Sequence, residues 1–136
     1  MPQNNQTTRR RNTQTNEAAI AALGGKMPPQ DIDAEESVLG ALLVENDAMQ
    51  EVVEILLPEH FYKDEHQRIY NAMMTLNTVN SGIDIITVCN ELAHTGELEQ
   101  VGGRAYIVDL TAKVATAANI IHHARIIFQK YLQRSL

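Results

Sequence analysis

The sequence of 136 residues contains no tryptophan, two phenylalanines and a single cysteine. With so few aromatic side chains, a core has to be built from Leu, Ile, Val, Met and Ala, and this aliphatic mixture favours helices over strands. One cysteine, Cys89, cannot form a disulfide within the chain, which fits a reducing cytosol. No apolar run approaches the length of a membrane span, and the N-terminus lacks a signal peptide. The sequence therefore predicts a soluble, cytoplasmic, all-α protein.

The formal net charge of −6 is spread unevenly along the chain. Residues 1–30 carry four basic side chains and one acidic side chain, whereas residues 31–136 carry seven basic and sixteen acidic ones. An acidic folded part lacks the basic face that binding to a phosphate backbone requires. Residues 1–16 are almost wholly Gln, Asn, Thr and Arg, with nothing to bury. We expect residues 1–30 to be a disordered polar and basic tail and linker, able at most to contact nucleic acid weakly, and residues 31–136 to be one helical domain.

Two glycine pairs invite comparison with phosphate-binding loops, whose pattern is G-x-x-x-x-G-K-[ST]. The Gly-Gly-Lys sequence at residues 24–26 is followed by Met27 instead of a hydroxyl residue, and no lysine follows Gly102 and Gly103 at the required place. A glycine pair before a helix can still cradle a phosphate on free N–H groups, but a tight corner between helices explains Gly102 and Gly103 better. We predict no cofactor site and no enzyme activity in this chain.

Apolar spacing and capping residues predict two helices before Pro58. Asp31 or Asp33 caps the first, whose buried stripe is expected to contain Ala34, Val38, Leu39, Leu42 and Leu43. The second is expected to begin with a capping box of Asp47 and Gln50 and to end at Pro58. Its inner face is predicted to contain Met49, Val52, Val53 and Leu56.

The third predicted helix contains His66, which shares the spacing of a buried face with Ile69, Tyr70 and Met73. A histidine on such a face is usually a hydrogen-bonded packing residue, and we interpret His66 in this way. A catalytic role would need a partner base or nucleophile, and residues 61–74 show none.

After a polar loop at residues 77–82, Asp84 caps a helix that ends at Gly96, where a left-handed C-cap favours glycine. Ile85, Val88, Cys89 and Leu92 are predicted to face inward. Gly103 is expected to start a short helix in tight contact with a neighbour. The buried face of this short helix is predicted to contain Tyr106, Ile107 and Leu110, and residues 111–116 are predicted to form the next connection.

The last helix is predicted to begin near Asn119 and to carry a broad apolar face. At about 100° per residue the face covers an arc of about 140°. It comprises Ala117, Ile120, Ile121, Ala124, Ile127, Phe128, Tyr131 and Leu132. Either the whole arc is core, or one half covers the domain and the other half is left for another helix.

Several short motifs occur in an order that strongly resembles one family, the N-terminal domain of the bacterial replicative DNA helicase (DnaB). The motifs are Asp33-x-Glu35 with Ser37-Val38-Leu39-Gly40, Phe61-Tyr62 with His66 and Ile69-Tyr70, Asp84 with Thr87-Val88 and Leu92, Gly96-x-Leu98, Val101-Gly102-Gly103 with Tyr106, and Ala118-Asn119-Ile120. The resemblance covers roughly residues 28–134. His123 stands where the family usually has an aromatic residue, and Gln129 stands near a usual acidic position.

The resemblance implies a compact orthogonal bundle of about six helices, with the last helix starting a helical hairpin that is truncated here. Family members are hexameric rings that unwind DNA at the replication fork, and their C-terminal motor, which uses ATP and Mg, is missing from this chain. The family's N-terminal domain forms a collar that pairs subunits and receives primase, and helicase loaders also act on the ring. We expect this chain to dimerise weakly through a candidate surface of Ile121, Phe128, Tyr131 and Leu132.

The sequence also leaves room for three other functions. A metal enzyme could combine His122 and His123 with His94, His60 or His66, but adjacent histidines point about 100° apart on a helix and do not form the i, i+4 ligand pair that zinc helices favour. A helix-turn-helix DNA binder built from residues 84–95 and 103–110 offers Arg104 as its single cation, opposed by Asp109. A helical adaptor of another complex remains the main alternative.

Overall fold

The computed structural model describes residues 27–113 and 119–136, so the predictions for residues 1–26 and for residues 114–118 lie outside the described residues. Within these ranges the chain forms six α-helices, two short 3-10 helices and no strand. The elements are α2 (Ile32–Val44), η1 (Asn46–Ala48), α3 (Met49–Val52), η2 (Pro58–His60), α4 (Asp64–Thr78), α5 (Ile85–His94), α6 (Gly103–Ala112) and α7 (Ile120–Arg134). The predicted all-α class is confirmed.

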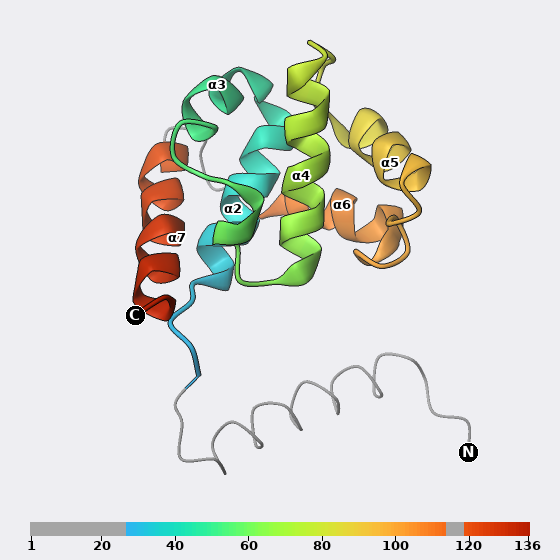
Figure 1. The fold of residues 1–136 in the computed structure, drawn as a ribbon. Helices are drawn as coiled ribbons and strands as arrows, with labels where there is room; N and C mark the ends of the chain where they lie inside the picture. The colour runs from blue at the N-terminus through green and yellow to red at the C-terminus, as the bar shows by residue number, and fades with distance from the viewer. Residues whose placement is uncertain (1–26, 114–118) are drawn as a thin grey trace, which may run out of the picture.

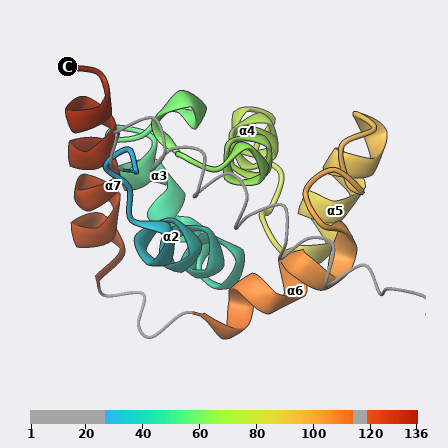
Figure 2. The same ribbon diagram turned by 90° about the horizontal axis from the view of Figure 1, so that it is seen from below.

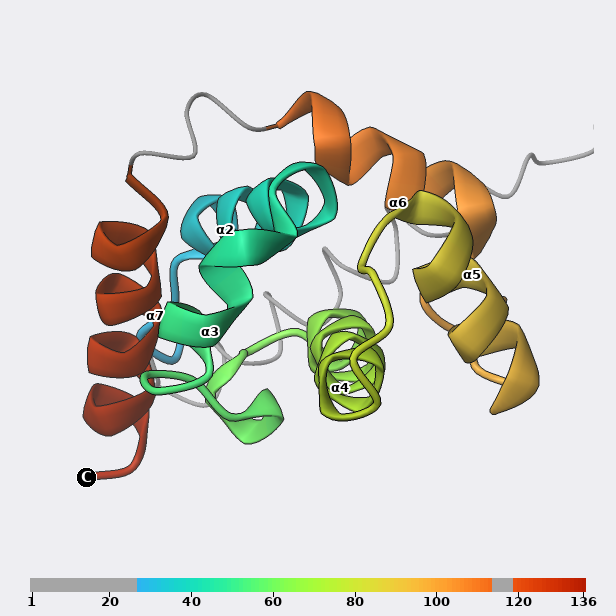
Figure 3. The ribbon, with the colours of Figure 1, turned by 90° about the horizontal axis from the view of Figure 1, so that it is seen from above.

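Helix α2 lies at the centre of the bundle and contacts α4, α6 and α7 (Figure 1). Seen from below and from above, α7 and α5 lie at opposite edges, with α2 and α4 between them (Figures 2 and 3). Asp31 caps α2 by accepting a hydrogen bond of 3.0 Å from the Ala34 N–H. The five residues predicted for its apolar stripe are all buried, because neighbouring helices cover α2 on several sides.

Local capping chemistry fixes both ends of α5 as predicted. Asp84 accepts a hydrogen bond of 2.9 Å from the Thr87 N–H, and the Thr87 hydroxyl accepts one of 3.0 Å from the Asp84 N–H. At the other end, Gly96 has a φ of +77°. The next N–H, of Glu97, reaches back to the Leu92 carbonyl at 2.7 Å, which completes a Schellman motif.

The predicted second helix is wrong in length and in its cap. Helix α3 ends at Val52, well before Pro58, and no side chain caps its start. The Gln50 amide donates to Asn77 at 2.9 Å instead of reaching back to form a capping box with Asp47. Of the predicted face, Met49, Val52 and Leu56 are buried, and Val53 is partly buried against the core.

Two helices run further than the sequence predicts. Helix α4 runs on to Thr78 and so includes the first two residues of the predicted loop at 77–82. Helix α6 likewise runs on to Ala112, past the expected boundary at Thr111. Both differences amount to two residues at the end of a helix, where the last turn frays and local sequence determines the boundary least.

Candidate protein-interaction site

A buried polar network joins α2, α4 and α6 through residues of the recognised motifs. The Glu35 carboxylate on α2 accepts hydrogen bonds of 2.7 Å from the Tyr62 N–H and from His66 Nδ1–H. On its other side, His66 Nε2 lies 2.6 Å from the hydroxyl of Tyr106 on α6. His66 and Glu35 are buried, and no buried side-chain polar atom in the described part of the chain lacks a partner. The interpretation of His66 as a hydrogen-bonded packing residue is confirmed.

The network resembles a carboxylate–imidazole–hydroxyl relay, but its surroundings are those of a core. Burial raises the pKa of the Tyr106 hydroxyl, and the carboxylates of Glu36, Glu65 and Glu35 raise it further, so this group holds its proton. These side chains line neither the apolar pocket between α2, α5 and α6 nor the polar pocket beside η1, which are both described below. The arrangement therefore fixes three helices relative to one another and is poorly placed to meet a substrate.

The aromatic residues of the same motifs form the adjoining part of the core. The rings of Phe61 and Tyr70 are both buried, with their centroids 5.0 Å apart. The Tyr70 hydroxyl donates to the Leu56 carbonyl at 2.9 Å, and burial raises its pKa. Tyr62 lies further out, with the Arg134 guanidinium 5.3 Å from its ring centroid.

The glycine corner before α6 is present, but the close contact is at a different glycine. A Cβ on Gly102 would lie 2.9 Å from the Tyr106 Cβ, whereas a Cβ on Gly103 would have no neighbour within 4 Å. The expectation of a tight contact at Gly103 is therefore wrong. Both residues have positive φ values, +105° and +74° respectively, so backbone conformation explains glycine at position 103.

The apolar arc of α7 divides into an inner and an outer half. The inner half, Ile120, Ala124 and Ile127, is buried. Ile121, Phe128 and Tyr131 are only partly buried, and Leu132 is 47% exposed. The interpretation that part of the arc is left over thus agrees with the burial, although its role as a pairing surface stays a prediction.

The C-terminal half of α7 is attached to the rest of the domain through His60. The His60 ring lies 5.1 Å from the Phe128 ring and 4.5 Å from the Tyr131 ring. Burial lowers the pKa of His60, and the nearby charge of Arg134 also lowers it, while Glu59 acts in the opposite direction. Arg134 donates to the carbonyls of Pro29 at 2.8 Å and of His60 at 2.9 Å, so it ties the end of α7 to both segments.

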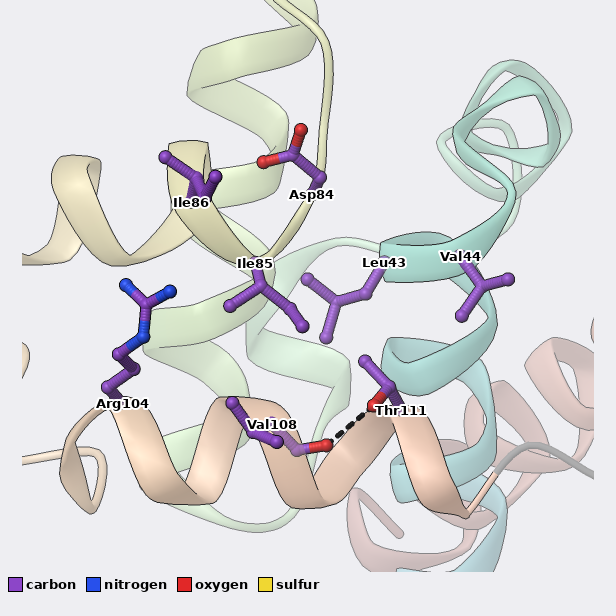
Figure 4. A pocket seen from close by; sticks show the side chains of 8 residues that line it. All are labelled: Leu43, Val44, Asp84, Ile85, Ile86, Arg104, Val108 and Thr111. Atoms are coloured by element: carbon purple, nitrogen blue, oxygen red, sulfur yellow. Dashed lines mark hydrogen bonds between the residues drawn. The ribbon is translucent and has the colours of Figure 1, made fainter.

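An apolar pocket of about 490 Å³ opens where α2, α5 and α6 meet (Figure 4). Its lining comes from the end of α2, the start of α5 and one face of α6: Leu43, Val44, Asp84, Ile85, Ile86, Arg104, Val108 and Thr111. Nothing in the sequence indicated this pocket, because its side chains come from three helices and several lie outside the predicted buried faces.

No group of three or more His, Cys, Asp or Glu side chains in residues 27–113 and 119–136 is arranged to hold a metal ion. Within the same ranges, no helix combines the length and the apolar character needed to cross a bilayer. A second pocket, which is polar, lies between η1 and the end of α4 and is lined mainly by Asn, Gln and Ser side chains.

Comparison with known proteins identifies the fold. The crystal structure of the N-terminal domain of DnaB helicase from Mycobacterium tuberculosis superimposes with a TM-score of 0.78 at 42% identity, covering 79% of this chain and 77% of that one. A DnaB-like replicative helicase, described with its interactions with primase, gives a TM-score of 0.68 at 31% identity, covering 77% of this chain and 25% of that one. The fold is that of a replicative helicase N-terminal domain.

Sequence comparison agrees. Residues 27–129 match the family described as the DnaB-like helicase N terminal domain, and the chain belongs to that family. The replicative DNA helicase DnaB of Rhodothermus marinus is 46% identical over 126 residues, which are 93% of this chain and 13% of that protein. The replicative DNA helicase DnaC of Bacillus subtilis is 44% identical over 114 residues, which are 84% of this chain and 25% of that protein. The chain thus spans a quarter or less of the length of these relatives.

Proposed function

We propose that this chain is the protein-interaction and oligomerisation domain, or collar, of a replicative DNA helicase that unwinds DNA at the replication fork. In this role it pairs subunits of a hexameric ring, docks primase, and is a possible contact for a helicase loader. Family membership supports the helicase assignment over the alternative of an unrelated helical adaptor. The structural relative described with its interactions with primase supports the choice of primase as partner.

The observation that carries the pairing role is the divided apolar arc of α7. Its inner half packs into the core, whereas Leu132 is exposed and its neighbours on the outer half are only partly covered. A row of incompletely covered apolar side chains along one helix edge is typical of a surface that another molecule covers. We assign this outer edge, Ile121, Phe128, Tyr131 and Leu132, to contact with a second copy.

Catalysis is assigned to another part of the parent protein. No phosphate-binding pattern occurs in the sequence, so ATP and Mg belong to the motor domain of the relatives and not to these residues. Contact with DNA is likewise assigned to that motor, with a weak contribution from the basic tail at most. The role at a bacterial replication fork places the protein in the cytoplasm, associated with the nucleoid.

Titration of purified primase into this chain, followed by light scattering on a size-exclusion column, tests the proposal. We expect a stable complex with primase and a concentration-dependent dimer in its absence. ATP-stimulated phosphate release should not rise above a buffer blank. Absence of any primase complex would overturn the docking role, and a strict monomer at every concentration would overturn the pairing role.

A further inference from the structure

The hydroxyl group of Tyr106 has one proton and two acceptors within reach. Its oxygen lies 2.6 Å from Nε2 of His66 on α4 and 3.4 Å from Oε2 of Glu36 on α2. Burial and the nearby carboxylates raise the pKa of the hydroxyl, so the proton stays on Tyr106. Because a hydroxyl group has a single proton to donate, the state of the two acceptors decides which helix Tyr106 donates to.

While the imidazole is neutral, the acceptor is His66. The Glu35 carboxylate accepts from Nδ1–H at 2.7 Å, so the one ring proton is on Nδ1 and the lone pair of Nε2 is free to accept. Tyr106 then donates across the shorter contact of 2.6 Å. Glu36 receives no proton from Tyr106 in this state, and the Lys113 ammonium lies 3.5 Å from its other oxygen, Oε1.

A second proton on the imidazole reverses the direction of this hydrogen bond. The second proton can be taken up at Nε2 alone, because Nδ1 already carries one. Nε2–H then donates to the Tyr106 oxygen, which leaves the tyrosine proton free to point at Oε2 of Glu36. One proton is taken from solvent, the imidazole becomes an imidazolium, and no other group changes its charge. Hydrogen bonds to charged groups are stronger than those between neutral groups, so the new bond to the Glu36 carboxylate should be short.

The charges around the two rings are mainly negative. They are three carboxylates and one ammonium, namely Glu35 and Glu36 on α2, Glu65 on α4, and Lys113 at the end of α6, whose side chain is 53% exposed. Among the described residues, no side chain of η2, α5 or α7 makes a hydrogen bond or an ion pair with either ring. An imidazolium formed here would therefore have one carboxylate in direct contact and a second one linked through the tyrosine hydroxyl.

We propose that His66, Tyr106 and Glu36 form a proton-operated switch, in which protonation of His66 turns the Tyr106 hydroxyl towards Glu36. In the neutral state the hydroxyl ties α6 to α4. In the protonated state it ties α6 to α4 and to α2 together. Helix α2 packs on both of the other helices, so the added bond joins all three at one point. The switch is a property of the folded domain and requires no partner.

NMR spectra of the labelled chain, recorded between about pH 8 and about pH 5, test the switch. The ring nitrogens of His66 should report a proton on Nδ1 alone at the upper pH and on both nitrogens at the lower pH. The carboxyl carbon of Glu36 should change with the same midpoint, and about threefold more than in Tyr106→Phe, which lacks the hydroxyl that links the two groups. Glu65, which pairs with Lys63 at 3.4 Å, is the internal control, and its carboxyl carbon should respond equally in both proteins.

Crystal structures of the unaltered chain at the two pH values give a second test, which decides the matter if Tyr106→Phe fails to fold. The distance between the Tyr106 oxygen and Glu36 Oε2 should shorten from 3.4 Å to about 3.0 Å or less at the lower pH, while the contact with His66 is kept. An unchanged distance would overturn the proposal, and so would a His66 ring that keeps one proton throughout. An equal response of Glu36 in the wild type and in Tyr106→Phe would also overturn it, because the charge of His66 would then act through space alone.

Discussion

Helices α4 and α7 are equally long, with 15 residues each, and both pack on α2, yet they are held in different ways. Helix α4 is fixed by a buried network of hydrogen bonds. The Glu35 carboxylate and both ring nitrogens of His66 have partners in it. Helix α7 is held by three buried aliphatic side chains and, near its end, by His60 and Arg134. The comparison shows that α4 is committed to the fold, whereas α7 leaves one apolar edge partly uncovered, the edge that we propose for contact with another subunit.

The largest effect is expected from breaking the α4 attachment. Glu35→Ala removes the acceptor for the Tyr62 N–H and for His66, and leaves the buried imidazole and the partly buried N–H without that partner. We expect a loss of about 3–5 kcal/mol in the free energy of unfolding, measured by urea denaturation. Asp33→Ala, which removes an exposed carboxylate from the same turn, is the control and should change stability by less than about 1 kcal/mol. Equal effects of the two substitutions would show that the network does not hold α4.

A smaller effect is expected at the glycine corner, which positions Tyr106 for the same network. Gly102→Ala forces a Cβ against Tyr106 and also strains a positive φ, so it should cost about 1–3 kcal/mol. Gly103→Ala strains the backbone alone and should cost about 1 kcal/mol. The melting temperatures of the two variants, compared with that of the wild type, measure these losses of stability. The reverse order would contradict the assignment of the close contact to Gly102.

The stability of the domain should depend on pH through His60, which holds the end of α7. We expect this effect to be smaller than those of the Glu35 and glycine substitutions. The pKa of His60 in the folded protein is lowered from its ordinary value of 6.5, so the unfolded chain binds a proton more readily. The contribution of the neutral His60 side chain to the free energy of unfolding is therefore complete above about pH 6.5. It is lost as the pH falls below that value. Protonation also removes Nδ1 as the acceptor for the Leu57 N–H, which donates to it at 2.9 Å.

Urea unfolding of the wild type and of His60→Asn, at about pH 7.5 and about pH 5, measures this dependence. The asparagine supplies an acceptor that does not titrate, so the variant should lose less stability on acidification than the wild type. Equal losses in both proteins would show that His60 does not contribute to the pH dependence.

Local chemistry explains how much of this could be predicted from the sequence. The caps of α2 and α5, the left-handed Gly96 and the buried face with His66 depend on residues within one or two turns of one another, and all were predicted. The hydrogen-bond partners of His66 could not be predicted, since Glu35 lies 31 residues away in the sequence and Tyr106 lies 40 residues away. A buried histidine on a helix indicates that some partner exists, but only the fold supplies it.

The same limit applies to the candidate interaction site. The division of the α7 arc was a stated alternative because a broad apolar arc is visible in the sequence, but which half faces outward depends on the position of α2. The pocket was missed because Val44, Ile86 and Val108 lie at exposed positions of three different helices.

The most direct test of the claim that α7 keeps a free pairing edge is sedimentation equilibrium of the wild-type chain and of Phe128→Asp/Leu132→Asp. Phe128 also contacts His60, so Leu132→Asp alone, at an exposed position, is the cleaner companion variant. We predict a weak monomer–dimer equilibrium for the wild type, because association entropy offsets most of the gain of about 25 cal/mol per Å² from burying one helix edge. Both variants should be monomeric, and Leu132→Asp should keep the melting temperature of the wild type. Wild-type dimerisation in Leu132→Asp and in the double variant would contradict the account.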